Sequence, residues 1–299
     1  MIASSVIMIR PTAFGFNTET APSNAFQHSA NYPSSQVQLA ALKEFEALYA
    51  ALTEKGIEVI PFNDTVVPTK PDAIFPNNWF STHADGTIFL YPMLSPVRRK
   101  ERREDILERL KEISVVKELI DLSPFEDKGK FLEGTGSLVF DHSNKIIYAA
   151  LSPRTDAPLA QVVADELKHE LVTFKTADKK GEAIYHTNVV MNVSDSLAVV
   201  CFDCITENKA AVKQTLQTSG KEIIEISVEQ MENFCGNMLL LQNKQPQKFM
   251  VMSERAFKSL DAAQMKTIEK HAEIIYSSLS TIEEVGGGSA RCMLAEVYC

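Results

Sequence analysis

The sequence predicts an α/β protein made of five similar modules, and two observations support this. First, a unit of strand, helix, strand, loop and strand recurs five times along the 299 residues. Second, the strands that follow the helices begin near residues 57, 115, 171, 221 and 272, which is 50 to 58 residues apart. Five such modules favour a five-bladed α/β propeller around a pseudo-fivefold axis, because radial repetition leaves few exposed sheet edges. A doubly wound sheet is the alternative, but the chain has no G-x-G-x-x-G pattern.

The first module shows how each unit is identified. Residues 6–9 form an apolar run that is typical of a strand, and residues 37–55 carry apolar side chains at helical spacing. These side chains are Leu39, Leu42, Phe45, Leu48 and Leu52. Gly56 is predicted to end the helix, and residues 57–60 are predicted to form the next strand.

The other modules follow in the same order. Further helices are predicted over 98–113, 157–170, 207–219 and 253–271. The strands before these helices are predicted over 87–91, 145–151, 197–202 and 248–252. The last strands of the five modules are predicted over 73–81, 136–140, 187–193, 237–242 and 292–298. We therefore expect a single domain over residues 1–299.

Composition restricts the class of protein. The chain is 45% hydrophobic and 23% charged, as in ordinary globular proteins. Its net charge of −9 argues against a nucleic acid or an anionic membrane as partner. Its five cysteines are an odd number, which favours a reducing compartment over a disulfide framework. The N-terminus lacks a basic region of the signal-peptide kind, and no run is long enough to span a membrane. We expect a soluble, cytoplasmic protein.

The C-terminal run of three glycines, 286–288, is followed closely by Cys292 and an apolar ending. Glycines allow tight turns and the close approach of another group. A cysteine presented in this way is a plausible nucleophile, because a thiolate needs access and nearby donors. A buried structural cysteine after a flexible turn is the alternative.

The loop before the last strand of each module carries the other reactive side chains. In module order these loops contain Asp72, Glu133, His186, Cys235 and Cys292. Equivalent positions of a cyclic repeat converge on its axis, so we expect carboxylates, imidazole and thiol to meet there. Each of them also has a structural explanation, and Cys235 is predicted to be a buried structural thiol.

Two other features are predicted to be structural. Cys201 and Cys204 form a lone C-x-x-C in a β-rich run, where strand spacing places the two thiols on opposite faces. A zinc or redox site is therefore not favoured. The charged cluster 98–104 mixes both signs and is predicted to be a solvated helix face, from which Arg98 alone could reach inward.

These residues resemble those of the guanidine-modifying (pentein) superfamily, which includes arginine deiminases, dimethylarginine dimethylaminohydrolases and amidinotransferases. The similarity is carried by 71–78, 132–134, 152–155, 186–188 and 286–292, which occur in the family's order. Residues 16–20, 24–27 and 75–79 look most like the citrulline-utilisation hydrolase branch, often labelled amidinotransferase.

The resemblance implies a mechanism. Cys292 attacks the carbon of a guanidino or ureido group, and His186 protonates the departing amine and then activates water against a thiouronium-type intermediate. Glu133 holds the imidazole and favours its charged form. No metal or organic cofactor is implied.

The resemblance also implies how a small ureido or guanidino amino acid binds. Arg154 and Arg98 would bind its carboxylate, and Asp72 and Asn78 belong to the segment that binds substrate in the family. Residues 11–36 are long enough to form an active-site lid.

Two departures reduce the negative charge of the pocket. Deiminases and dimethylargininases have an acidic residue at the position of Asn78, and deiminases have a second carboxylate at that of Asn188. A neutral ureido group such as that of citrulline is therefore favoured over a guanidinium.

We expect a hydrolase of non-peptide carbon–nitrogen bonds. The alternatives are an amidinotransferase, in which an amine replaces water, and a non-catalytic ring that binds an amino acid. A papain-like protease is disfavoured because its cysteine precedes its histidine. The oligomeric state stays open, with a homodimer as one option.

Overall fold

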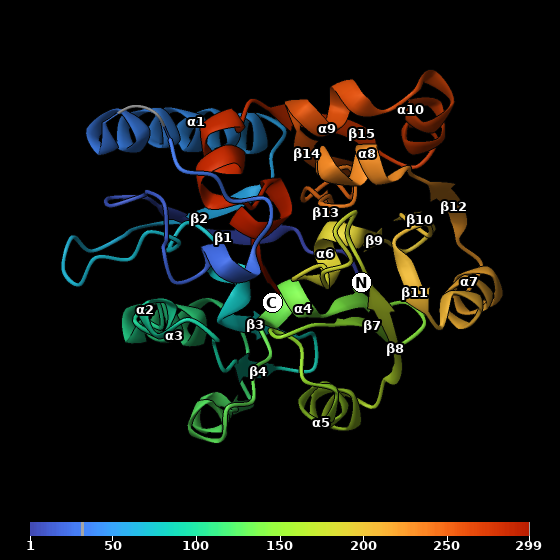
Figure 1. The fold of residues 1–299 in the computed structure, drawn as a ribbon, viewed down its shortest axis with the longest axis horizontal. Helices are drawn as coiled ribbons and strands as arrows, with labels where there is room; N and C mark the ends of the chain where they lie inside the picture. The colour runs from blue at the N-terminus through green and yellow to red at the C-terminus, as the bar shows by residue number, and fades with distance from the viewer. Residues whose placement is uncertain (31–32, 299) are drawn as a thin grey trace.

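A computed structural model describes residues 1–30 and 33–298, so Cys299 and residues 31–32 of the predicted lid lie outside the described part of the chain. Within that part the strands form five small sheets. Helices lie at the periphery, and short helical turns lie near the centre (Figure 1). In the same part of the chain, no helix has the length and apolarity that crossing a membrane requires.

All five sheets share one pattern, in which a middle strand pairs parallel with an outer strand and antiparallel with an inner strand. From inner to outer strand they are β16 (Ala295–Val297), β1 (Ser5–Arg10) and β2 (Glu58–Asn63); β3 (Phe80–Thr82), β4 (Thr87–Leu90) and β5 (Glu118–Asp121); β6 (Val139–Asp141), β7 (Ile146–Leu151) and β8 (Glu170–Thr176); β9 (Met191–Val193), β10 (Leu197–Val200) and β12 (Glu222–Glu225); β13 (Leu239–Gln242), β14 (Lys248–Ser253) and β15 (Glu273–Ser277). An additional strand, β11 (Ile205–Glu207), which the sequence did not predict, extends the third sheet beyond β8.

The sequence module and the sheet are different units. The last strand of each module pairs with the first strand of the next, as β3 does with β4 and β6 with β7. The final strand β16 pairs back onto β1, where Val6 lies opposite Glu296. The two ends of the described chain therefore join in one sheet. The outer strands begin at residues 58, 118, 170, 222 and 273, which confirms the predicted fivefold repeat.

The peripheral helices connect the middle and outer strands of each sheet (Figure 1). They are α1 (Ser34–Glu54), α2 (Pro96–Arg99) with α3 (Glu104–Ile113), α5 (Ala157–Leu167), α7 (Lys209–Thr218), and α9 (Glu254–Ser259) with α10 (Ala262–Glu269). The buried stripe of α1 is Val37, Ala41, Phe45, Leu48 and Leu52, whereas Leu39, which was expected to lie in this stripe, is exposed.

Two predicted helices are divided in the structure. The predicted helix 253–271 breaks at Leu260, because Asp261 starts a new helix there. The Asp261 carboxylate accepts hydrogen bonds from the backbone N–H groups of Ala263 and Gln264 and so satisfies donors that would otherwise end unpaired. The predicted helix 98–113 breaks between α2 and α3, where Arg103 adopts an extended backbone.

One short crossing segment leads from each outer strand to the next inner strand, which gives five crossing segments in the described chain. These crossing segments contain η2 (Pro76–Asn78), α4 (Gly134–Ser137), α6 (Thr187–Val190), residues 234–237 after α8 (Val228–Glu232), and η5 (Ala290–Met293), which follows the π-helix η4 (Ile282–Gly286). The last predicted strands therefore begin later than expected. The turn α4 contacts both η2 and α6, and η2 contacts η5, so the crossing segments gather at the centre (Figure 1).

Candidate active site

Side chains and backbone groups link the crossing segments to one another. Asn77 donates through Nδ2 to Oγ1 of Thr135 at 3.2 Å, which joins η2 to α4. Asn237 donates to the carbonyl of Asn188 at 3.0 Å and accepts from the backbone N–H of Arg291 at 3.1 Å. The fourth crossing segment is thereby tied to the third and the fifth. These bonds place the predicted reactive residues in one region.

Two glycines permit the close approach of these segments. Gly134 has a φ of +47°, and a Cβ there would lie 2.3 Å from the carbonyl oxygen of Asn77. A Cβ on Gly136 would lie 2.5 Å from Nδ2 of Asn78 and 2.7 Å from the ring of His186. All three distances are too short for real contacts. The Glu-Gly-Thr-Gly sequence is therefore needed for packing at the centre, and Nδ2 of Asn78 and the ring of His186 both lie beside Gly136.

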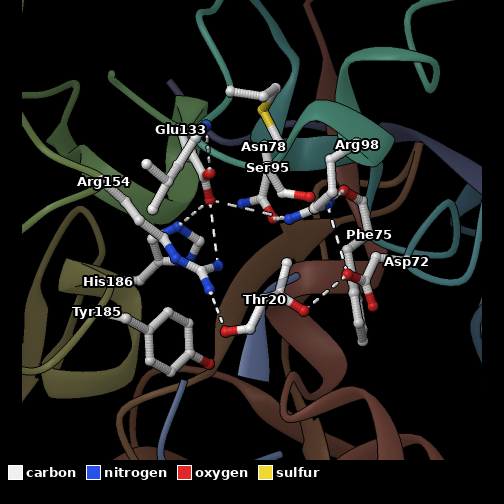
Figure 2. Close-up of polar contacts among 12 residues, drawn as sticks. Thr20, Asp72, Phe75, Asn78, Ser95, Arg98, Glu133, Arg154, Tyr185 and His186 are labelled. Atoms are coloured by element: carbon white, nitrogen blue, oxygen red, sulfur yellow. Dashed lines mark hydrogen bonds and ion pairs between the residues drawn. The ribbon is translucent and has the colours of Figure 1, made fainter. Parts of the chain in front are cut away.

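Glu133 and His186 form a buried pair, as predicted. Oε2 of Glu133 lies 2.8 Å from Nε2 of His186 and 3.4 Å from Nη1 of Arg154. Figure 2 shows His186 and Arg154 on one side of Glu133, with Asn78 and Arg98 on the other. Burial alone would raise the pKa of Glu133, but Arg154, His186 and Arg98 together outweigh it and hold that pKa well below its ordinary range. Glu133 is therefore an anion at neutral pH.

The charge state of His186 differs from the expectation. Burial lowers its pKa to about 4, and the positive charges of nearby Arg154 and Arg98 lower it further. The attraction of Glu133 raises the pKa but does not offset these effects. His186 is therefore neutral at pH 7 in this closed state. Since the anionic Glu133 can only accept, Nε2 carries the proton, and Nδ1 is left as a free base. The imidazole is set up to take a proton rather than to give one first.

Cys292 is almost completely buried and is surrounded by amides. Nδ2 of Asn237 lies 3.3 Å from Sγ of Cys292, and Nδ2 of Asn188 lies 3.7 Å from it. Both amides are donors that could stabilise a thiolate. Asn237 was not predicted as a site residue, although it stands in the loop of the fourth module that matches the other four. That equivalence was the signal that could have found it.

The guanidinium of Arg98 points inward and donates four hydrogen bonds. Its Nε and Nη2 donate to the two carboxylate oxygens of Glu101, each at 2.9 Å, and its Nη1 donates to Oδ1 of Asn78 at 2.8 Å. Nη2 also donates to the carbonyl of Phe75 at 3.2 Å. Arg98, which the sequence allowed to reach inward, is 2% exposed, and the prediction of a solvated face is wrong for Glu101, which is 3% exposed. Burial raises the pKa of Glu101 to about 7, although Arg98 opposes this rise.

Two buried polar groups near Arg98 have no partner in the described part of the chain. Oδ2 of Asp72 accepts from Asn17 at 2.7 Å and from Thr20 at 3.3 Å, but Oδ1 of Asp72 accepts from no group in the described chain. Nδ2 of Asn78 likewise donates to no described group. Burial raises the pKa of Asp72, although Arg98 lowers it. A buried acceptor and a buried donor without partners are costly unless a ligand satisfies them.

The predicted lid closes over these groups. Arg154 donates through Nη2 to the carbonyl of Thr20 at 3.1 Å and to Oγ of Ser23 at 2.8 Å. Asn24 donates through Nδ2 to the carbonyl of Gly287 at 3.3 Å, and the backbone N–H of His28 donates to the carbonyl of Glu284 at 2.7 Å. Lid residues therefore contact both Arg154 and the segment that leads to Cys292.

One small cavity unites the predicted site residues. Its walls include Asp72, Asn78, Arg98, Arg154, His186 and Cys292, together with Thr20 and Asn24 of the lid. Its volume of about 20 Å³ has room for about one water molecule. The cavity as described is too small for an amino acid, and residues 20 and 24 of the predicted lid form part of its wall. Glu133 lies behind His186 and does not line the cavity.

The other three described cysteines lie away from this cavity. Cys201 and Cys204 lie just after β10 in a turn rather than within a strand, so the expected placement on opposite faces is wrong. Sγ of Cys204 donates to the carbonyl of Cys201 at 3.1 Å. Cys235 is buried, as predicted, and its thiol donates to the carbonyl of Ala256 at 3.3 Å. Burial raises the pKa of Cys235 to about 12, which suits a structural thiol.

Comparisons with solved structures show the same fold. ArgZ, an arginine dihydrolase from the ornithine-ammonia cycle in cyanobacteria, aligns with a TM-score of 0.77 at 16% identity, over 98% of this chain and 40% of the longer ArgZ chain. The N-terminal domain of an ArgZ variant, covalently bound to a reaction intermediate, aligns with a TM-score of 0.75 at 16% identity, over 98% of this chain and 97% of that domain. A dimethylarginine dimethylaminohydrolase adduct with S-methyl-L-thiocitrulline aligns with a TM-score of 0.67 at 14% identity, over 99% of this chain and 100% of that one.

Comparison with protein families gives the assignment. No curated protein matches the sequence significantly. The model of the family described as N,N dimethylarginine dimethylhydrolase, eukaryotic, matches residues 10–299. The chain therefore belongs to this family, and with it to the guanidine-modifying pentein superfamily and to the hydrolases that act on carbon–nitrogen bonds other than peptide bonds.

Proposed function

We propose that this chain is a cofactor-free cysteine hydrolase that releases ammonia from a ureido or guanidino amino acid, with a neutral, citrulline-like substrate favoured. One observation carries the proposal. The wall of a single cavity combines Cys292 and His186 with Asp72 and Asn78, and Oδ1 of Asp72 and Nδ2 of Asn78 are buried without a partner in the described part of the chain. The acceptor on Asp72 suits a substrate N–H group, and the donor on Asn78 suits a substrate oxygen.

The first half of the proposed reaction forms a covalent intermediate. Sγ of Cys292 bonds to the ureido carbon, the thiol proton passes to Nδ1 of His186, and the carbonyl electron pair moves onto oxygen. When the carbonyl re-forms, the bond to the terminal nitrogen breaks. His186 returns its proton to that nitrogen, so ammonia leaves. Glu133 stabilises the transient imidazolium, and the amides of Asn188 and Asn237 stabilise negative charge on sulfur.

The second half regenerates the enzyme. His186 takes a proton from a water molecule through Nδ1, and the water oxygen attacks the same carbon. The carbon–sulfur bond breaks, and the proton returns to Cys292. A ureido substrate leaves as a carbamate, which loses carbon dioxide to give the amine. A guanidino substrate passes through a thiouronium intermediate and leaves as the ureido compound.

Other parts of the molecule have proposed roles in this function. Arg154 lies in the cavity wall and binds the substrate carboxylate once the lid opens. Pairing of β16 with β1 supports a single catalytic domain over residues 1–299, closed as a five-bladed propeller with the site on its axis. The four described cysteines are unpaired, which supports a reducing compartment such as the cytoplasm.

Mass spectrometry of the intact protein, with ammonia release followed in parallel, tests the proposal. The protein is quenched in acid during incubation with citrulline and, separately, with arginine, the substrate of the arginine dihydrolase ArgZ. We expect an adduct on Cys292 and ammonia release, both absent from Cys292→Ser. Release of ornithine from arginine without ammonia, and only when an amine acceptor is present, would indicate the amidinotransferase instead. Absence of an adduct, ammonia and transfer with either substrate would contradict both functions.

A further inference from the structure

We propose that Arg98 and Glu101 are positioning residues that fix the amide of Asn78, so that its NH₂ group faces the reaction cavity and selects a substrate with a neutral oxygen. The inference rests on the proposed function and names the structural basis of its substrate preference. It also gives Arg98 a different role from the carboxylate clamp that the family resemblance implies.

The donors of Arg98 are nearly exhausted. A guanidinium has five N–H donors, and four of those on Arg98 are committed to Glu101, Phe75 and Asn78. Nη1 also lies 3.9 Å from Oε2 of Glu133. A bidentate grip on a substrate carboxylate needs two free donors from one guanidinium. Arg98 cannot supply them without giving up bonds that it makes in a fully buried position.

The contact with Arg98 determines how the Asn78 amide is turned. Because a guanidinium only donates, the Asn78 atom 2.8 Å from Nη1 must be the oxygen. The NH₂ group must then point the other way, and it lies beside Gly136 and the ring of His186, as the short distances from a Cβ on Gly136 show. There it has no partner in the described chain. Asn78 lines the cavity, and its contact with Arg98 therefore determines that a donor rather than an acceptor is left for a ligand there.

A donor at this point discriminates between the two substrate classes. A ureido oxygen can accept from Nδ2 of Asn78, whereas every nitrogen of a guanidinium is a donor or lacks a lone pair for acceptance. A guanidinium would leave Nδ2 buried and unpaired. An unpaired buried donor of this kind corresponds to roughly a 10- to 100-fold loss in kcat/KM.

Glu101 acts through Arg98. Its two oxygens hold Nε and Nη2 in a planar fork, which leaves Nη1 directed at Asn78. Glutamine at this position offers one acceptor oxygen, but its NH₂ group cannot accept a hydrogen bond from the second N–H donor of Arg98. Lysine at position 98 offers a single ammonium on a flexible stem, which cannot hold the fork of Glu101 and Oδ1 of Asn78 in the same way. In both variants the Asn78 amide is free to turn its oxygen toward the cavity.

The test is the ratio of kcat/KM for citrulline to kcat/KM for arginine. We expect the wild type to favour citrulline by about tenfold or more, and Arg98→Lys and Glu101→Gln each to move the ratio toward arginine by about tenfold or more. Asn78→Asp should move it in the same direction. Arg99→Lys is the matched control, because Arg99 contacts the carbonyl of Met93 and Glu126 outside the cavity wall. A purely structural defect lowers both rates together and leaves the ratio unchanged.

Binding separates failure of this inference from failure of the proposed function. Calorimetry gives the same ratio as dissociation constants in a Cys292→Ser background, where no reaction occurs. An unchanged ratio in the Arg98 and Glu101 variants, or a wild type that prefers arginine, overturns the inference while the hydrolase stands. Binding that shifts as expected, in a protein that turns over neither substrate, overturns the hydrolase while the inference stands. Absence of both binding and turnover overturns both. Glu101→Gln keeps the test available if Arg98→Lys does not fold.

Discussion

One carboxylate oxygen of Glu133 lies 2.8 Å from Nε2 of His186, although the two residues are 53 positions apart in the sequence. They come from two adjacent crossing segments at the centre of the molecule (Figure 2). Because burial removes competing water, this contact determines both the orientation and the tautomer of the imidazole. The free base at Nδ1, on which the proposed mechanism depends, is a consequence of this one contact.

Replacement of Glu133 by glutamine tests that dependence. The variant keeps an acceptor for Nε2 but loses the charge that stabilises imidazolium, so we expect kcat to fall by about 10²- to 10⁴-fold. Steady-state ammonia release measures the change. Glu126→Gln is a suitable control. Glu126 pairs with Arg102 at a distance of 2.6 Å, and neither residue lines the cavity. Equal losses in the two variants would show that the effect comes from altered packing rather than from the His186 contact.

Replacement of Asn237 by alanine tests the residue that the sequence did not reveal. The change removes a bond to the carbonyl of Asn188, leaves the N–H of Arg291 without its acceptor, and removes a donor to Cys292. We expect the free energy of unfolding to fall by about 1–3 kcal/mol, as measured by urea unfolding. Alkylation of Cys292 by iodoacetamide should also slow, because its thiolate loses a stabilising donor. Asn233→Ala, which removes exposed hydrogen bonds to Glu229 and Arg255 away from the cavity wall, should leave the alkylation rate unchanged.

The fold was largely predictable, because the pattern that indicates each element is local. Apolar periodicity in each module located the helices and outer strands to within a few residues. The break at Leu260 could also have been predicted, because Asp261 followed by Gln264 is a capping box. The pairing of each last strand with the next module was not readable, because it depends on contacts between segments far apart in the sequence.

The site was predictable to the extent that it follows the repeat. Equivalence of the five loops located Glu133, His186 and Cys292 before any contact was known. Glu101 was missed because an Arg and a Glu three positions apart on a short helix usually form a solvated pair. Only the buried neighbours Asn78 and Phe75 turn Arg98, and with it Glu101, toward the centre. Polar residues whose role depends on such neighbours carry no signal in a single sequence.

Stability should fall in acid because His83 and His186 are buried and His142 is half-buried, which disfavours their protonated forms. Burial lowers the pKa of His83 to about 3 and those of His142 and His186 to about 4, from an ordinary value of 6.5. Between pH 6.5 and about 4 the unfolded chain therefore binds more protons than the folded one, and protons favour unfolding. Each histidine then contributes a loss on the order of 1.4 kcal/mol per pH unit. Glu101, with its pKa raised to about 7, opposes the loss, because its folded carboxyl binds a proton more readily.

Urea unfolding at pH 7, 6 and 5 measures this slope. His83→Gln removes one depressed group, so its free energy of unfolding should decline less steeply with falling pH than that of the wild type. The same slope in His83→Gln and in the wild type would contradict the contribution assigned to His83.

The acid limb of activity should depend on Arg154. Its positive charge helps to lower the pKa of His186, after burial. Arg154→Gln should therefore raise the pKa of His186 and move the acid limb of kcat/KM upward from about pH 4, because the reaction needs neutral Nδ1. The pH profile between 5 and 8 should be flat on the acid side for the wild type and should decline for the variant. Arg255→Gln, an exposed arginine elsewhere, should retain the wild-type shape even if its rate changes.

Replacement of Gly136 by alanine tests the close approach on which the whole site depends. The added Cβ would lie 2.5 Å from Nδ2 of Asn78 and 2.7 Å from the ring of His186, so at least one of the two must move. Overpacking of this kind costs about 1–3 kcal/mol of stability, and displacement of either group by about 1 Å lowers kcat by about 100-fold. Gly15→Ala is the matched control, since a Cβ there meets no atom within 4 Å. Urea unfolding and ammonia release measure both effects. Wild-type activity in Gly136→Ala would mean that His186 and Asn78 need not lie as the structure places them for the reaction to proceed.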